Sequence, residues 1–531
     1  MGGKMPPPPL TGRGVKEGRS LFVPTARTGM MGAMKPLSAG ILSFGMTLAL
    51  GAAGVAVWLS SSMAYEFKLR LPGSDGTAGL AGQDVPEKLE GKLTAFDGKP
   101  MPGARGSWPC FRGATREGIS DDMTALADSW PAGGPKAAWA MKVGEGHAGV
   151  AILQGRVFLH DYDADKRQEV IRCMSLADGK DIWAYAYKVR IKRNHGVSRT
   201  VPAVTDQYLL ALGAKCHVTC LDSNTGQLQW AIDLVSEYGT KVPPWYAGQC
   251  PMIDDGNAIL APCGSVAEYV DSAGRIAKRG KDVLMTAIRC KAGPDGARQV
   301  VWEVPNTDLW QMTHSSIAVL ELEDYTKIYV YCGSGGLVGV RAEDGKVLFK
   351  TMDWKIRIAN VPTPVAVRED GKLFGKLFFC GGYGAGSMIL QVLKEGDAYA
   401  AKVLVRNPPA VFGSQQQTPI SYKNHLFGTR VDEQFICMSA QGQVVWTSGP
   451  DSKFGKEGGG YVIADDKVFA LDDDGVMTMF RATPQSYQQL GRAKVLGGHH
   501  SWGPIAVADG FMICRDLGSI VCLDLRARKE Q

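Results

Sequence analysis

The sequence predicts an all-β fold, an eight-bladed β-propeller preceded by one N-terminal transmembrane helix. Three observations lead to this prediction. A pattern of strand, glycine turn and strand recurs along the chain, its last copy lacks one strand, and a single charge-free apolar stretch precedes all copies. The chain has 531 residues, of which 45% are hydrophobic and 21% are charged. This composition excludes a disordered chain, and a single long apolar stretch excludes a polytopic membrane protein.

The amino-terminal apolar stretch is long enough to cross a membrane. No charged residue occurs between Lys35 and Glu66, and residues 39–59 alone would form a helix about 30 Å long. We expect residues 37–64 to be a transmembrane signal anchor or a signal sequence. The sequence SMA at 62–64 suits signal peptidase, whereas the length of the apolar run favours an uncleaved anchor.

The positive charge of the chain is concentrated before this stretch. Residues 1–36 form a predicted basic, Pro-containing cytoplasmic tail. Up to residue 35 they carry six basic residues and one acid, which is five of the six net positive charges. By the positive-inside rule the tail stays cytoplasmic and the rest reaches the exported side, periplasmic or extracellular. Because the rest is nearly neutral, we expect no nucleic-acid partner. Residues 65–106, rich in Gly, Pro and charge, form the predicted linker.

From residue 107 to residue 531 the chain is built of repeats. The clearest copies share a short apolar strand, a turn with glycine, and an aromatic residue four positions after that glycine. These copies are RCMSLADGKDIW (172–183), TCLDSNTGQLQW (219–230), VGVRAEDGKVLF (338–349) and ICMSAQGQVVW (436–446). Trp183 and Trp230 lie 47 residues apart, and four degenerate copies bring the number of units to eight. A period of about 40–50 residues is typical of a propeller blade with four short strands.

The two ends of the repeat array complement each other. The last unit stops after residue 525 without its final strand, and an unpaired strand with Trp139 in the aromatic position occurs at the start. We predict that residues 136–141 pair with residues 520–525 and close the ring, because closure removes exposed sheet edges. The recurring aromatic side chains are expected to pack between blades.

The cysteines follow the repeats as well. Nine of the twelve recur at two strand positions of the units, so we expect small buried core residues rather than a disulfide framework. Cys110 and Cys250 fall outside this pattern, and a disulfide between them is the one pairing left open.

The pattern Cys/Ala-x-Asp/Ser-x-x-Gly-x-x-x-Trp resembles the tryptophan-docking repeat of propellers similar to pyrroloquinoline-quinone (PQQ) dehydrogenases. The opening SWPCFRGATREGIS (107–120) and the Trp139 strand are similar to exported or membrane-anchored PQQ-like repeat proteins. That superfamily includes quinoprotein alcohol dehydrogenases and outer-membrane assembly lipoproteins of the BamB type. The resemblance covers about residues 107–525. It implies the fold and leaves the activity open, because one fold hosts many functions.

Ligands of propellers gather near the central axis, where the loops that enter the innermost strand of every blade converge. In this chain these loops carry polar side chains that are candidates for a ligand or cofactor pocket: His147, Asn194, His195, Arg199, Gln249, His314, Asn360, Gln416, His499, His500 and Trp502. Such a pocket would suit an anionic, hydroxylated or metal-containing ligand. Alternatively, these side chains hydrogen-bond the loop backbones and buried waters. No local ligand spacing supports a metal site, and no catalytic residue can be assigned.

Three functions compete. The favoured one is a membrane-anchored scaffold that binds a small polar ligand or a protein partner at the propeller face. The alternative that the resemblance implies is a quinoprotein dehydrogenase that oxidises alcohols or sugars with PQQ and calcium. Such enzymes typically use adjacent cysteines and several carboxylates, and the axial loops hold only Glu145 and Glu457 as acids. The third is an enzyme that uses the histidines on a carbohydrate or another polar substrate. No cofactor is assigned with certainty.

Overall fold

The computed structural model describes Leu48, Leu50, Gly51 and residues 89–270, 276–356, 358–396, 398–455 and 457–527. The chain divides into two units, Met1–Leu69 and Arg70–Gln531. Of the first unit only the three residues named above are described, and they are helical. The predicted tail, nearly all of the predicted anchor, and residues 65–88 of the predicted linker lie outside the described residues. Within the described ranges, no helix is both long and apolar enough to span a bilayer.

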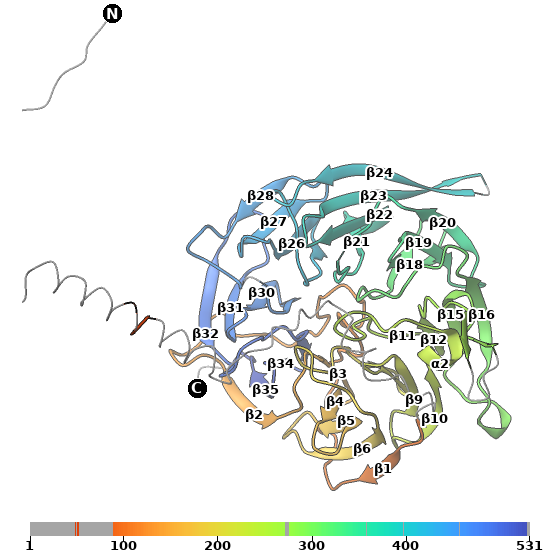
Figure 1. Ribbon diagram of the computed structural model, residues 1–531. Coiled ribbons are helices and arrows are strands. Elements are labelled where there is room, and N and C mark those ends of the chain that lie inside the picture. The colour runs from red at the N-terminus through yellow and green to blue at the C-terminus, as the bar shows by residue number, and fades with distance from the viewer. Residues whose placement is uncertain are drawn as a thin grey trace, which may run out of the picture. The chain divides into compact units, whose positions relative to one another are not determined.

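The second unit is a ring of eight antiparallel sheets, numbered here as blades 1 to 8 in chain order (Figure 1). Blades 1 to 4 take up the first half of the ring. Their strands are β3 (Val150–Leu153), β4 (Arg156–Asp163), β5 (Gln168–Ser175) and β6 (Asp181–Lys188); β7 (Ala203–Val204), β8 (Tyr208–Leu212), β9 (His217–Asp222) and β10 (Leu228–Asp233); β11 (Met252–Asp254), β12 (Asn257–Leu260), β15 (Val283–Arg289) and β16 (Val300–Pro305); and β17 (Ala318–Glu321), β18 (Lys327–Gly333), β19 (Gly336–Arg341) and β20 (Val347–Thr351).

Blades 5 to 8 complete the ring. Their strands are β21 (Val365–Glu369), β22 (Lys372–Gly381), β23 (Gly386–Glu395) and β24 (Ala398–Asn407); β25 (Ile420–Tyr422), β26 (His425–Thr429), β27 (Phe435–Ser439) and β28 (Val444–Thr447); β29 (Tyr461–Ala464), β30 (Lys467–Leu471), β31 (Val476–Arg481) and β32 (Gln489–Lys494); and β33 (Ala506–Ala508), β34 (Phe511–Arg515), β35 (Ser519–Asp524) and β2 (Lys136–Lys142). The predicted eight-bladed architecture is confirmed.

Blade 8 closes the ring in the predicted way. Strand β2 is its outer strand and pairs antiparallel with β35, with Trp139 opposite Cys522. The first and last parts of the propeller therefore share one sheet. Closure leaves no blade with a missing strand at the junction, which is how a propeller limits its exposed edges.

Three elements lie outside the four-stranded pattern. Strand β1 (Lys92–Ala95), within the predicted linker, pairs with β6 and makes blade 1 five-stranded. A hairpin of β13 (Ala267–Val270) and β14 (Ile276–Arg279) is inserted in blade 3, between β12 and β15. The helix α2 (Leu234–Tyr238) and the 3-10 turn η2 (Pro294–Gly296) occupy loops.

The spacing of glycine and tryptophan has a direct packing reason. All four repeat glycines have a positive φ, and the tryptophan ring of the preceding blade lies against three of them, Gly179, Gly226 and Gly345: a Cβ added to Gly226 would come within 2.7 Å of the Trp183 ring. The indole nitrogens of Trp139, Trp230, Trp302 and Trp446 also donate to carbonyls of the next blade, as Trp302 does to Ala342 at 3.1 Å. Within a blade, Trp183 lies opposite Cys173, because a small residue leaves room for the ring. The predicted role of these aromatics in packing between blades is confirmed.

The cysteines are also as predicted for core residues. All twelve are free and buried, including Cys110 and Cys250, so the structure contains no disulfide between these two. Burial raises the pKa of both thiols.

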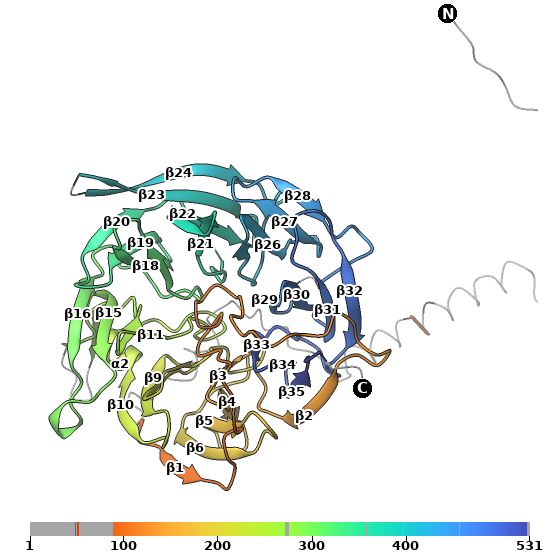
Figure 2. The same cartoon turned by 180° about the vertical axis from the view of Figure 1, so that it is seen from behind.

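The centre of the ring is occupied by the chain itself. Residues 105–120, called the central segment, run through the middle of the propeller as the orange trace in Figure 2. Trp108 forms a two-hydrogen-bond bridge with Ile152 of β3, and Ile119 bridges to Ile463 of β29. Between them, the buried Arg112 donates to the carbonyls of Thr418 and Pro419 in blade 6. The segment thus ties together the inner strands of blades 1 and 7 and the loop that enters blade 6.

Candidate functional site

A cavity of about 350 Å³ lies on the propeller axis, at the face that carries the loops leading into the innermost strand of each blade. Its volume is at the lower end of the range for small-molecule sites. The loops before all eight innermost strands contribute to its walls, and the central segment forms its floor. The polar and aromatic side chains that line it are Trp108, Phe111, Arg112, His147, His195, Arg199, Trp245, His314, Ser316, Tyr383, Gln415, Gln416, Gln417, Thr418, Glu457, Tyr461 and Trp502.

The structure brings six of the predicted site residues together in this cavity. They are His147, His195, Arg199, His314, Gln416 and Trp502. His500 lies next to them: its ring stacks on Trp502 with 4.4 Å between ring centroids and 13° between planes. Their role in binding stays a prediction.

The other four predicted residues do not line this cavity. Gln249 is buried and exchanges hydrogen bonds with the backbone of Ala261, so it supports the loop of blade 3. Asn360 is buried beside the start of blade 5. The Asn194 carbonyl accepts from Arg199, and the exposed His499 contacts Asp474 at 3.3 Å. For Gln249, both hydrogen bonds go to the loop backbone, as the alternative interpretation predicted.

Two cavity histidines are neutral at physiological pH. His147 Nε2 lies 2.9 Å from the His195 carbonyl, and His314 Nε2 lies 2.7 Å from the Pro244 carbonyl. A carbonyl only accepts, so each Nε2 carries the proton. Burial, and then the nearby Arg199, lower the pKa of His147 to about 3 and that of His314 to about 4. The bare Nδ1 of His147 is buried and has no hydrogen-bond partner, so it is an acceptor ready for a donor.

Two cations line the cavity, Arg112 and Arg199, and Arg112 donates to four backbone carbonyls. Arg199 donates to the carbonyls of Trp245, Asn194 and His195. Burial lowers the pKa of its guanidinium to about 10, which leaves it charged at pH 7. Among the described residues no Asp or Glu forms an ion pair with it. Three of its five N–H groups are used, so it retains capacity and charge for an anionic group.

The opposite wall is built of amides. Gln415, Gln416 and Gln417 are consecutive in the loop before β25 and all line the cavity. Gln416 Nε2 donates to the Glu457 carboxylate at 3.1 Å, and Gln417 Nε2 donates to the Gly458 carbonyl at 3.0 Å. These side chains present both donors and acceptors, which suits hydroxyl groups.

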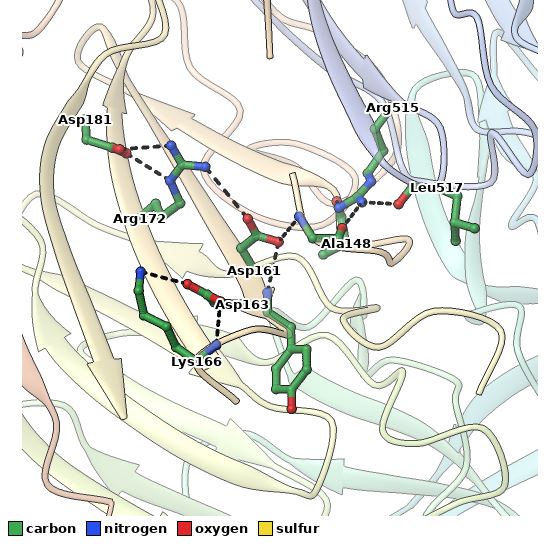
Figure 3. Close-up of polar contacts among 10 residues, drawn as sticks. Ala148, Asp161, Asp163, Lys166, Arg172, Asp181, Arg515 and Leu517 are labelled. Carbon is green, nitrogen blue, oxygen red and sulfur yellow. Dashed lines mark hydrogen bonds and ion pairs between the residues drawn. The ribbon is translucent and has the colours of Figure 1, made fainter. Parts of the chain in front are cut away.

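A buried arginine fixes the loop that carries His147. Arg515, 1% exposed at the end of β34, donates to the carbonyls of Gly144, Ala148, Asp516 and Leu517. From the other side Asp161 accepts the Gly144 amide at 2.9 Å and contacts Arg172 at 3.7 Å (Figure 3). The loop is therefore held between blades 8 and 1, and His147 with it.

The floor of the cavity was not predicted from the sequence. Trp108, Phe111 and Arg112 belong to the central segment, which precedes the repeats and has no periodicity of its own. The available signal was Cys110, which falls outside the repeat positions of the other cysteines. A second, smaller cavity of about 240 Å³ lies behind Phe111 and Arg112, which line both.

Comparison with known proteins identifies the family. The family model described as outer membrane protein assembly factor BamB matches residues 166–448, more than half of the chain. The chain belongs to this family. No curated protein matches it.

A solved structure agrees with the fold of this BamB-type, PQQ-like propeller. A europium-containing methanol dehydrogenase is 12% identical, with 78% of this chain and 90% of that one covered and a TM-score of 0.51. BamB from Moraxella catarrhalis is 13% identical, with 73% and 99% covered and a TM-score of 0.48. At such identity the first likeness shows the fold alone.

The residues of this BamB-type propeller do not fit a calcium–PQQ centre. Calcium takes six to eight oxygen ligands, mostly from carboxylates. Glu457 is the one carboxylate among the residues that line the axial cavity, and Gln416 already binds it. Across the part of the chain that the structure describes, no three His, Cys, Asp or Glu side chains are grouped to hold a metal ion.

Proposed function

We propose that this protein is a binding propeller whose axial cavity takes a small polar ligand, and that residues 37–64 anchor it with the propeller on the exported side. One observation carries the binding role: neutral, buried acceptors and an uncompensated cation share a cavity with aromatic walls. His147 Nδ1 lacks a donor, and Arg199 lacks a carboxylate. Both needs are met by a ligand that offers a hydroxyl or N–H group and an anionic group.

The quinoprotein alternative is less well supported by these residues. A dehydrogenase would need a base near the alcohol and an ion to polarise it. The two most buried cavity histidines have lowered pKa values and are neutral, as a base must be, but a pKa of about 3 makes His147 a weak one.

Tryptophan fluorescence of the purified full-length chain tests the binding role, because Trp108, Trp245 and Trp502 line the cavity. The chain is titrated with a panel of hydroxylated carboxylates and sugars, and separately with PQQ and calcium. We expect saturable quenching by a panel member that is weakened at least tenfold in His147→Phe and unchanged in His499→Ala, whose side chain is exposed. Saturable PQQ binding with alcohol-dependent dye reduction would replace this proposal with the dehydrogenase.

Reporter fusions test the anchoring. Alkaline phosphatase, which is active only after export, is fused after residue 70, and a cytoplasmic fluorescent protein is fused before residue 1. We expect both fusions to be active and the chain to remain in the membrane fraction after carbonate washing. A soluble exported product would show that the segment is cleaved, and an inactive phosphatase would overturn the topology.

A further inference from the structure

A basic loop leads to the axial cavity. Residues 188–199, called the basic loop, join β6 to β7 and contain Lys188, Arg190, Lys192, Arg193 and Arg199 but no Asp or Glu. The buried side chains of Val189 and Ile191 anchor the loop, while the cations between them are exposed. Because the propeller part of the chain is nearly neutral, this is a local concentration of charge.

The loop is continuous with the cavity wall. Its last residues, His195 and Arg199, line the cavity. Its middle is fixed to neighbouring loops: the Tyr246 hydroxyl donates to the Lys192 carbonyl, and Arg193 pairs with Glu145, two residues before His147. An anion that approaches along these cations is therefore delivered to Arg199.

The cavity itself is suited to a hydroxylated ring. Trp245, Trp502 and Tyr383 offer aromatic surface, on which the C–H face of a sugar ring packs. The three glutamines and the bare His147 Nδ1 offer hydrogen-bonding partners for hydroxyl groups. A cavity of about 350 Å³ holds only the end of a longer molecule.

An extended acidic peptide fits these features less well. Peptides that bind to sheets use an unpaired strand edge. Here the inward-facing edges of β3 and β29 already form bridges with Trp108 and Ile119 of the central segment. The cavity also offers rings and amides rather than a row of backbone groups.

We propose that the ligand is an acidic oligosaccharide, a chain of uronic-acid units. Its end unit occupies the cavity, with its carboxylate near Arg199, and the carboxylates of the following units lie along Lys188 to Arg193. The inference rests on the proposed binding function of the axial cavity and names its ligand class. Such pairing is between exposed charges, so it weakens with salt.

Calorimetry with the full-length chain tests this inference. The probes are a hexamer of galacturonate, its fully methyl-esterified neutral form, and a glutamate hexapeptide. The variant is Lys188→Glu/Arg190→Glu, and the control is Lys372→Glu/Lys402→Glu, which reverses two exposed lysines on blade 5. We expect the galacturonate to bind at least tenfold more tightly than its ester. Only the basic-loop variant should lose at least tenfold in affinity. The affinity of the natural chain should fall as salt is raised from about 50 to about 300 mM, because salt shortens the Debye length and screens exposed charges.

Every other outcome overturns the inference. Equal binding of acid and ester, or no effect of the basic-loop variant, removes the role of the loop but leaves a sugar site in the cavity. Tighter binding of the glutamate peptide assigns the site to a protein partner. If none of the three probes binds but another small ligand binds saturably and His147→Phe weakens that binding, the ligand is not an acidic oligosaccharide. The proposed binding function is then retained. If no small ligand binds at all, both fail. Unchanged circular dichroism verifies that each variant is folded.

Discussion

At the scale of single residues, the axial site depends on two buried arginines that are held by backbone carbonyls. Arg199 and Arg515 each donate to several carbonyls and to no carboxylate in the contacts described. Both guanidinium groups have pKa values lowered to about 10 by burial and still carry their charge at pH 7. They differ in place, since Arg199 faces the cavity and Arg515 lies behind the loop of His147. One is placed to meet a ligand and the other to hold the wall.

Replacing Arg515 should therefore cost stability and disturb His147 together. Arg515→Met leaves the carbonyls of Gly144, Ala148 and Leu517 without these donors inside the protein. We expect a loss of about 3–5 kcal/mol in the free energy of unfolding, measured by urea denaturation. Arg515→Lys should recover part of it. In the exposed Arg526→Met the loss should stay below about 1 kcal/mol. A loss equally small in Arg515→Met would show that water replaces the guanidinium.

Acid should destabilise the fold through His147 and His314. Their folded pKa values, about 3 and about 4, lie below the unfolded value near 6.5, so the unfolded chain binds more protons between these limits. Stability is fully present above about pH 6.5 and falls as the pH is lowered towards 4. In that window each histidine lowers the free energy of unfolding by about 1.4 kcal/mol for each pH unit of acidification.

His147→Gln isolates this contribution. Unfolding free energies are measured by urea denaturation at several pH values from 7.5 to 4.5, a window that spans roughly the unfolded histidine pKa. We expect the variant to lose stability with a smaller slope than the natural chain. Equal slopes would mean that His147 is protonated in the folded protein, against its lowered pKa.

At the scale of elements, the blades join through a glycine of one and a tryptophan of its neighbour. Gly226 has a φ of 76° and lies against Trp183, whereas Gly256 has a φ of 71° and open space around it. Gly226→Ala should cost about 2–3 kcal/mol, and Gly256→Ala about 1–2 kcal/mol for its backbone alone. Thermal unfolding of both variants measures the difference between the two losses of stability. This difference is the contribution of packing between Gly226 and the Trp183 ring. Equal losses would show that the Trp183 ring moves aside freely.

The blades and their closure could be predicted because they repeat. The spacing of Gly226 and Trp230 recurs along the sequence and reflects a contact between neighbouring blades. Trp139 marks the one strand that lies far in sequence from the rest of its blade. The central segment could not be predicted, since it is a single copy whose contacts, such as Arg112 with Thr418, join positions some 300 residues apart.

The site could be predicted in part for the same reason. Loop position alone places His147 and Gln416 at the axis. It does not decide which way a side chain turns, and Gln249 turns to the backbone of Ala261 in a loop of the same kind. Side-chain direction is set by local backbone and packing, which a repeat pattern does not encode.

At the scale of the whole molecule, the ring depends on β2, whose sequence lies far from its partner. Trp139 and Trp446 hold equivalent places: each lies opposite a cysteine, and each donates to a carbonyl of the next blade, Leu176 at 2.8 Å and Thr483 at 2.9 Å. Only Trp139 sits on the strand that closes the ring. Substitutions at the two positions therefore separate the stability that this contact gives to one blade junction from its contribution to closing the ring.

Trp139→Ala should be the more damaging of the two substitutions. Both lose a packed ring, at about 3–5 kcal/mol if fully buried and less here because both are partly exposed. Trp139→Ala also loosens β2 from β35, which exposes a sheet edge. We expect faster amide exchange in β35 and β2, and a larger aggregated fraction on size-exclusion chromatography, than for Trp446→Ala. Matching exchange and aggregation in the two variants would show that the backbone pairing of β2 closes the ring without its tryptophan.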